Sequence, residues 1–225
     1  MTANQPRTIP INRYPFTPRS YPGIRPKFSF FLTSEGIVRL KPRQLDRFLA
    51  ERNLPPANSR YAILAYGSNA CPSQLVTKKL TDVPVLYGRL VGATAVYTAR
   101  RAKRGYVPAT LARMKGSRSS WITLLTPDQV RTMDTTEGRP NFYSLVEVHG
   151  MHFYIGPCEV SPLYSYVDTR GGVMTIGGEI VALRSASQKC AKAMLSKAVR
   201  NESEKWLDYE IIPDLNPPPV FSRVH

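Results

Sequence analysis

The sequence predicts a mixed α+β domain, preceded by a proline-rich arm and followed by a helical extension. Three observations support this class. Hydrophobic residues make up 42% of the 225 residues, which is enough for a packed core. Apolar segments of strand character are separated by glycine and proline breaks, and only short segments show helical spacing of apolar residues. No run of eighteen apolar residues occurs, which excludes a transmembrane helix and predicts no membrane partner.

The arm comprises residues 1–30, in which proline recurs every three to five residues with arginines between. Each proline removes a backbone donor and favours extended geometry, so we expect no regular helix or central strand here. Such a segment either floats in solvent or wraps a surface. Wrapping is favoured by six interleaved aromatic residues: Tyr14, Phe16, Tyr21, Phe28, Phe30 and Phe31.

The next elements follow from local signals. Residues 41–53 are predicted to form a short helix, because Pro42 suits a first turn and apolar residues share one face. Residues 60–66 are predicted to form a short apolar strand. The strand is broken by a polar loop at 67–69, and a helix is expected over about 72–80. The order is strand, tight loop, helix.

Strand character then returns in three segments: residues 84–98, 106–114 and 121–126. A short helix is expected over 128–133. Residues 142–148 and 151–155 flank His149 and Gly150, which predicts a β-hairpin.

Near the C-terminus, the glycine pairs in residues 171–178 predict a flexible turn or another hairpin. Ser185 or Ser187 can cap a helix that runs to about residue 200. The chain is thus divided into a basic arm with its helix (1–58), a core (59–160) and an extension whose helix packs on the core (161–225).

The net charge of +15 lies in the first two of these segments. Residues 1–58 hold 10 basic and 3 acidic residues, residues 59–160 hold 13 and 6, and residues 161–225 hold 8 and 7. A basic loop at 100–104 contains Arg100, Arg101, Lys103 and Arg104. With the arm, this loop could bind an acidic partner or nucleic acid, or it could simply be a solvated loop.

The three cysteines, Cys71, Cys158 and Cys190, are far apart and form no Cys-x-x-Cys pair. An odd number of spaced cysteines argues against a disulfide framework. The N-terminal sequence also lacks the apolar run of a signal peptide. We therefore expect reduced thiols and a cytoplasmic location.

The first candidate site is the loop Tyr66, Gly67, Ser68 and Asn69, which follows the strand at 60–66. A glycine after a strand allows a sharp turn, and successive N–H groups of such a loop can converge on a carboxylate or phosphate. The same residues could also form an ordinary turn. No Gly-x-Ser-x-Gly motif surrounds Ser68, so a hydrolase nucleophile is not predicted there.

The second candidate is Glu137, which lies between a helix and the strand at 142–148. A carboxylate at a cleft between elements can act as a general base, although a glutamate in a surface turn has the same local sequence. His149 and His152 straddle a predicted turn, and no acidic or cysteine ligands accompany them. No metal site is predicted.

Taken together, these segments resemble the γ-glutamylcyclotransferase-like family over about residues 60–156. That family has a strand ending in Tyr-Gly-Ser-Asn, present here as Tyr66 to Asn69. It later has a helix leading into Asp-x-x-Glu-Gly, present as Asp134 to Gly138, and then a strand bearing a tyrosine, here Tyr143. The order and spacing of these motifs agree with the family.

The resemblance implies a small, barrel-like twisted sheet with flanking helices. It also implies an enzyme that cyclises a γ-glutamyl group to 5-oxoproline and releases the attached amine, without a metal or cofactor. Glu137 would be the general acid and base, the loop Tyr66, Gly67, Ser68 and Asn69 would hold the substrate α-carboxylate, and Tyr143 would line the pocket.

Two features depart from the family pattern. An arginine often found two residues after the tyrosine is Leu145 here, and a glycine common in the strand before the helix is missing from residues 121–125. The alternative is a catalytically inactive member that binds an acidic partner, nucleic acid or a larger assembly through its basic arm.

Overall fold

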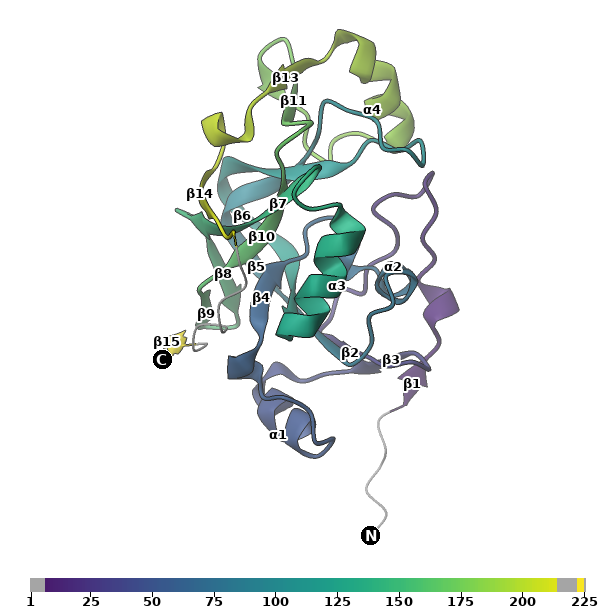
Figure 1. Ribbon diagram of the computed structural model, residues 1–225, viewed down its shortest axis with the longest axis vertical. Coiled ribbons are helices and arrows are strands. Elements are labelled where there is room, and N and C mark those ends of the chain that lie inside the picture. The colour runs from purple at the N-terminus through teal and green to yellow at the C-terminus, as the bar shows by residue number, and fades with distance from the viewer. Residues whose placement is uncertain (1–6, 214–221, 225) are drawn as a thin grey trace.

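A computed structural model of the chain describes residues 7–213 and 222–224. These residues form a mixed α+β architecture with one large and one small sheet (Figure 1). The large sheet has the spatial order β1 (Thr8–Ile9), β3 (Ile37–Arg39), β2 (Phe30–Leu32), β5 (Val83–Tyr97), β6 (Ala109–Leu125), β4 (Tyr61–Leu64), β10 (Tyr164–Asp168), β7 (Tyr143–His149) and β14 (Asp208–Ile211). A side branch of the sheet starts at β5: β8 (His152–Ile155) pairs with β5, β9 (Cys158–Ser161) pairs with β8, and β15 (Ser222–Val224) pairs with β9. The small sheet has the order β12 (Glu179–Ile180), β11 (Val173–Ile176) and β13 (Val199–Asn201).

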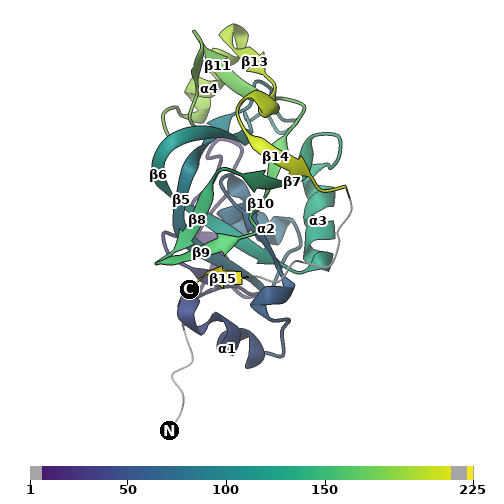
Figure 2. The same cartoon turned by 90° about the vertical axis from the view of Figure 1, so that its left-hand side faces the viewer.

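The large sheet is mixed and twisted, with β10 parallel to β4 and antiparallel to β7. The long strands β5 and β6 curve along its length (Figure 2), and β5 changes register at Gly92, which has a positive φ. The two ends of the strand order, β1 and β14, do not pair with each other within the described residues. The sheet is therefore open, and the closed small barrel is not formed.

Four α-helices accompany the sheets within the described part of the chain: α1 (Leu45–Ala50), α2 (Pro72–Thr77), α3 (Pro127–Glu137) and α4 (Gln188–Met194). In Figure 1, α2 and α3 lie side by side over the sheet, whereas α4 and the small sheet form one end of the molecule. The longest of these helices has 11 residues, too short to cross a bilayer, and none meets the requirement of length and apolarity.

The elements that lead to the candidate site are confirmed. β4 ends at Leu64, and α2 begins at Pro72 as the proline predicts. α3 is longer than expected because Thr126 forms a capping box with Gln129, and Gly138 ends the helix in the left-handed conformation. The short N-terminal helix, α1, buries Leu45 and Leu49.

The hairpin expected around His149 and Gly150 is wrong. β7 pairs with β10 and β14, whereas β8 pairs with β5 and β9. Gly150 has a φ of 67°, and a Cβ there would lie 2.6 Å from Nη2 of Arg113, so the chain turns here against a neighbouring strand. The turn sends β8 across to β5. The second glycine-rich segment does form a hairpin, β11–β12, around Gly177 and Gly178.

Two other boundaries differ from the sequence prediction. The segments 106–114 and 121–126 belong to one strand, β6, whose middle is exposed and polar and therefore lacks an apolar pattern. α4 is capped by Ser187 as expected but ends at Met194. The residues after it form a short 3-10 turn and then β13, which pairs with β11.

The arm wraps its own domain. Trp121 Nε1 donates to the carbonyl of Pro26 at 2.7 Å, and Ser73 Oγ donates to that of Tyr14 at 2.6 Å. The arm also leads directly into a strand, since β2 begins at Phe30 and lies between β3 and β5. All three segments 1–58, 59–160 and 161–225 thus contribute strands to the large sheet.

Candidate active site

The loop Tyr66–Asn69 lies between β4 and α2 and lines a cavity of about 690 Å³. A short 3-10 turn, Ser68–Ala70, follows Gly67 and carries Asn69 toward the C-terminal end of α3. Gly67 is required by a close approach, because a Cβ there would lie 2.9 Å from the hydroxyl of Tyr21. The sequence therefore builds a compact loop whose backbone and side chains face one cavity.

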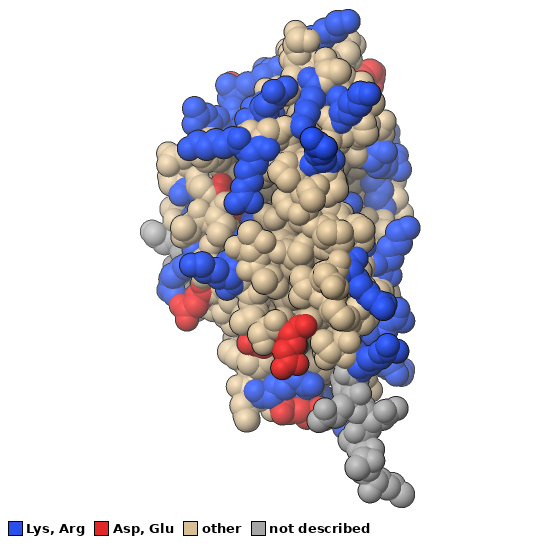
Figure 3. Space-filling view, turned by 90° about the vertical axis from the view of Figure 1, so that its right-hand side faces the viewer, with Lys and Arg blue, Asp and Glu red and all other residues tan. Residues whose placement is uncertain are grey.

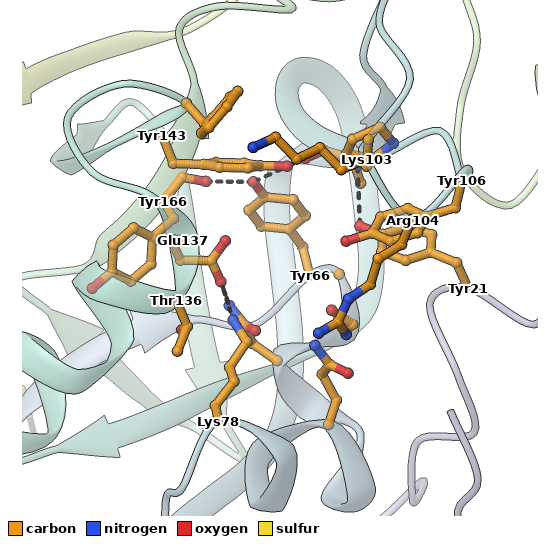
Figure 4. A pocket seen from close by; sticks show the side chains of 18 of the residues that line it. Tyr21, Tyr66, Lys78, Lys103, Arg104, Tyr106, Thr136, Glu137, Tyr143 and Tyr166 are labelled. Atoms are coloured by element: carbon orange, nitrogen blue, oxygen red, sulfur yellow. Dashed lines mark hydrogen bonds and ion pairs between the residues drawn. The ribbon is translucent and has the colours of Figure 1, made fainter. Parts of the chain in front are cut away.

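Glu137, the last residue of α3, points into this cavity (Figure 4). Its Oε1 accepts a hydrogen bond from Nδ2 of Asn69 at 2.9 Å and forms an ion pair with Nζ of Lys78. The Glu137 side chain is 13% exposed. Both contacts are made by this one oxygen, and Figure 4 shows the second carboxylate oxygen of Glu137 pointing into the cavity. Glu137 thus has one anchored and one available oxygen.

Lys78 is a site residue that the sequence analysis missed. It lies just after α2, is only 7% exposed, and also contacts Sδ of Met133 at 3.3 Å. The ion pair holds Glu137 in place from the side of α2. Nothing in the local sequence distinguishes Lys78 from the exposed Lys79 beside it, so only the fold identifies it.

Two buried amide oxygens on this side have no hydrogen-bond partner: Oδ1 of Asn69 and Oε1 of Gln74. The orientation of Asn69 follows from its contact, because a carboxylate accepts the amide N–H and the amide oxygen must point away. Gln74 lies in α2, is 7% exposed and lines the cavity. A buried acceptor without a donor is costly, so both oxygens are suited to a ligand that carries N–H groups.

Tyrosines form much of the remaining wall. The hydroxyl of Tyr143 donates to the carbonyl of Ala109 at 2.9 Å, and the hydroxyl of Tyr66 donates to the carbonyl of Tyr166. Burial raises the pKa of the Tyr66 and Tyr143 hydroxyls well above the ordinary value, and other buried tyrosines and Glu137 add to the shift. These residues therefore present neutral rings and fixed hydroxyls to the cavity.

The opposite wall comes from the arm. Tyr21 accepts a hydrogen bond from N–H of Ala109 at 3.0 Å and stacks on Tyr106, with ring centroids 4.7 Å apart. Arg25 donates to the carbonyl of Tyr66 at 2.9 Å and lies over the Trp121 ring. Burial lowers the pKa of the Arg25 guanidinium and raises that of the Tyr21 hydroxyl. The aromatic content of the arm was the only sequence signal for Tyr21.

Basic side chains surround the cavity. Arg100 lines it and forms an ion pair with Asp168, Nε to Oδ2 at 2.6 Å, where burial raises the pKa of the Asp168 carboxyl and Arg100 opposes the shift. Four more cations line the cavity: Arg101, Lys103, Arg104 and Arg170. Figure 3 shows that Lys and Arg also outnumber Asp and Glu on this side of the molecule, where they gather mainly in the upper part and along one edge.

The structure brings together all the residues that the sequence predicted for the site. Tyr66, Gly67, Ser68, Asn69, Glu137 and Tyr143 line one cavity, with Asn69 in contact with Glu137. Among the described residues, no group of three or more His, Cys, Asp or Glu side chains is placed to hold a metal ion. His152 instead pairs with Glu159, and the three cysteines are free.

Comparisons of the chain with protein-family models, with curated proteins and with solved structures gave no match. The site is therefore interpreted from its own geometry together with the motif resemblance.

Proposed function

We propose that this chain is a γ-glutamylcyclotransferase-like enzyme that converts a γ-glutamyl amine or peptide into 5-oxoproline and a free amine. One observation carries the proposal. Asn69 of the Tyr-Gly-Ser-Asn loop and Glu137 of the Asp-x-x-Glu-Gly motif are 68 residues apart in sequence, yet they share a hydrogen bond at the wall of a large cavity. The two motifs thus lie together at one cavity wall, as the proposed reaction requires.

The chemistry needs one base and one acid. The substrate's neutral α-amino nitrogen attacks its own δ-carbonyl carbon, and the free oxygen of Glu137 takes the proton released from nitrogen. The resulting tetrahedral intermediate then collapses. The bond from carbon to the leaving nitrogen breaks as Glu137 returns the proton to that nitrogen, which gives 5-oxoproline and the amine. No metal or cofactor is required in this sequence of steps.

The surroundings of Glu137 support this role. Lys78 and Asn69 fix Oε1, so the second oxygen can be held close to the reacting nitrogen. The unpartnered amide oxygens of Asn69 and Gln74 can accept N–H groups of the substrate's amine. Backbone N–H groups of the loop Gly67 to Asn69 would bind the α-carboxylate, and Tyr143 would form the wall beside the ring that closes.

The test is release of 5-oxoproline from a panel of γ-glutamyl amines, dipeptides and glutathione. For Glu137→Gln we expect kcat to fall about 10²–10⁴-fold, the usual contribution of a general acid–base group. The matched control is Glu179→Gln, which removes a carboxylate from an exposed strand outside the cavity. Normal turnover by Glu137→Gln would refute the assignment, as would an equal loss in both variants.

Binding of a polyanion, such as nucleic acid or an acidic protein, is a second candidate function. It is favoured by Arg7, Arg13 and Arg19 of the arm, which are exposed and form no ion pair with a described residue. The test is titration with a labelled oligonucleotide at increasing salt, comparing the wild-type chain with Arg7→Gln/Arg13→Gln/Arg19→Gln. Affinity that falls steeply with salt and is lost in the variant would support this function, and weak salt-independent binding would exclude it.

A further inference from the structure

The cavity has a strongly cationic rim, which the proposed reaction does not itself require. We define the cationic rim as Arg101, Lys103, Arg104 and Arg170. The first three lie on the loop between β5 and β6, and the fourth lies after β10. All four are cavity-lining, and none forms an ion pair with a described residue.

The other charges in the cavity wall are already compensated. Lys78 pairs with Glu137, and Arg100 pairs with the buried Asp168. A γ-glutamyl group brings one ammonium or amine and one carboxylate, and the loop Gly67 to Asn69 is assigned to that carboxylate. The charge of the rim is therefore left to interact with the other part of the substrate, the leaving amine.

The rim is held over the cavity by the fold. The basic loop closes on itself through N–H of Ala102 to the carbonyl of Tyr106 at 2.8 Å, and N–H of Ala99 ties its start to Gly171 at 3.2 Å. Arg170 lies over the Phe142 ring at 5.1 Å. Figure 4 shows Lys103 and Arg104 reaching into the pocket across from Glu137. Two rim charges are thus available to the part of a substrate that extends away from Glu137.

We propose that the leaving amine of the substrate carries about two or more negative charges on carboxylate or phosphate groups, so that the preferred substrates are γ-glutamyl conjugates of acidic amino acids or phosphorylated amines. The inference rests on the proposed function and adds the substrate class to it. Guanidinium groups bind carboxylates and phosphates in the same way, through charge-assisted hydrogen bonds. The shared chemistry is therefore the anion, and the substrate panel distinguishes its two sources.

The experiment compares four γ-glutamyl substrates of similar size, whose leaving amines are glutamate, glutamine, glutamine amide and O-phosphoserine. Each added charge should raise kcat/KM about tenfold at low salt, mainly through a lower KM. The difference should shrink as salt rises, because exposed charges are screened. The gain is compared per negative charge, because O-phosphoserine carries more charge than glutamate. A larger gain per charge for glutamate identifies carboxylates as the natural anion, and a larger gain per charge for O-phosphoserine identifies phosphate.

The variant Arg101→Gln/Lys103→Gln/Arg104→Gln removes three rim charges from an exposed loop. We expect its KM for γ-glutamyl-glutamate to rise at least about tenfold, with a much smaller change in kcat. The matched control is Arg184→Gln/Lys189→Gln/Lys197→Gln, which removes three exposed charges that do not line the cavity. This control should keep the preference for the diacid. The single variant Arg104→Gln repeats the test if the triple variant does not fold.

Binding to Glu137→Gln by calorimetry separates the two proposals. Turnover without a preference for anionic leaving groups overturns the inference and leaves the proposed function intact. Tight, rim-dependent binding of γ-glutamyl-glutamate without any turnover in the wild-type chain overturns the proposed function and keeps the anion site. Absence of both binding and turnover overturns both proposals. A preference for anionic leaving groups that the rim variant retains overturns the inference alone, because turnover is then still present.

Discussion

The two walls of the cavity are assembled in different ways. One wall consists of the loop after β4, the end of α3 and Tyr143, and the motifs for it are visible in the sequence. The other consists of Tyr21, Tyr106 and the basic loop, which carry no motif. The first wall holds the residues proposed for chemistry. The second wall, which we call the arm wall because Tyr21 of the arm anchors it, encloses the cavity and carries most of its positive charge. Under the proposed function, the reaction and the choice of substrate would be encoded in separate parts of the chain.

The largest expected effect is loss of stability at high pH, because buried tyrosines lie in both walls of the cavity. Burial raises the pKa of Tyr66, Tyr143 and Tyr166 on one wall and of Tyr21 and Tyr106 on the other. A raised folded-state pKa means that stability is complete below the unfolded value of about 10 and is lost as pH rises above it. Each tyrosine contributes up to about 1.4 kcal/mol per pH unit.

We therefore expect alkaline unfolding in which several phenols ionise together with loss of structure. The measurement is absorbance at the phenolate band followed in parallel with circular dichroism. Gradual phenol ionisation near pH 10 without unfolding would show that the walls are open to solvent.

The next largest effect is expected from removal of Tyr21, whose ring anchors the arm in the cavity wall. Tyr21→Ala should lower the free energy of unfolding by about 3–5 kcal/mol, the cost of deleting a buried aromatic ring. Tyr21 is 8% exposed, and its stacking on Tyr106 would be lost as well. Ile24→Ala, on the same arm but 51% exposed, is the control and should change stability little. Denaturant unfolding measures both, and equal small effects would mean that the arm is not integral to the domain.

The smallest effect is expected from a change at Gly67, where the two walls of the cavity meet at the Tyr21 hydroxyl. Gly67→Ala places a Cβ about 2.9 Å from the Tyr21 hydroxyl, which must then move away from Ala109. We expect a loss of about 1–3 kcal/mol from overpacking. The same substitution in a Tyr21→Phe background should cost less, because the hydroxyl is absent. A double-mutant cycle measures the coupling, and additive effects would show that the two walls act independently.

Sequence reasoning succeeded where structure is local. The strand, glycine and proline around Tyr66, and the helix that ends at Glu137, depend on neighbouring residues. Lys78 and Tyr21 were not predicted, because their roles arise from partners more than fifty residues away. Gln74 was not predicted because only the fold places it in the cavity wall. β2 and β3 were missed for a similar reason, since three-residue strands beside a proline-rich arm have no measurable period.

The open sheet shows a further limit. The path of each connecting turn decides which strands pair. A family resemblance predicts only the overall form of the sheet and not each of these pairings. Here the turn at Gly150 carries β8 to β5, so that β7 pairs with β14 instead. The positive φ of Gly150 and its close approach to Arg113 accompany this path, and the spatial neighbour is not visible in the sequence.

The threading of the arm has a consequence for biosynthesis. Tyr21 and Pro26 are made early, but Ala109, which binds Tyr21, lies 88 residues later, and Trp121, which binds Pro26, lies 95 residues later. During translation the arm therefore cannot form these contacts until β6 has emerged from the ribosome. Contacts between such distant residues slow folding because a long loop must close first. The cavity is thus completed late, and a chain interrupted before β6 would lack part of the cavity wall.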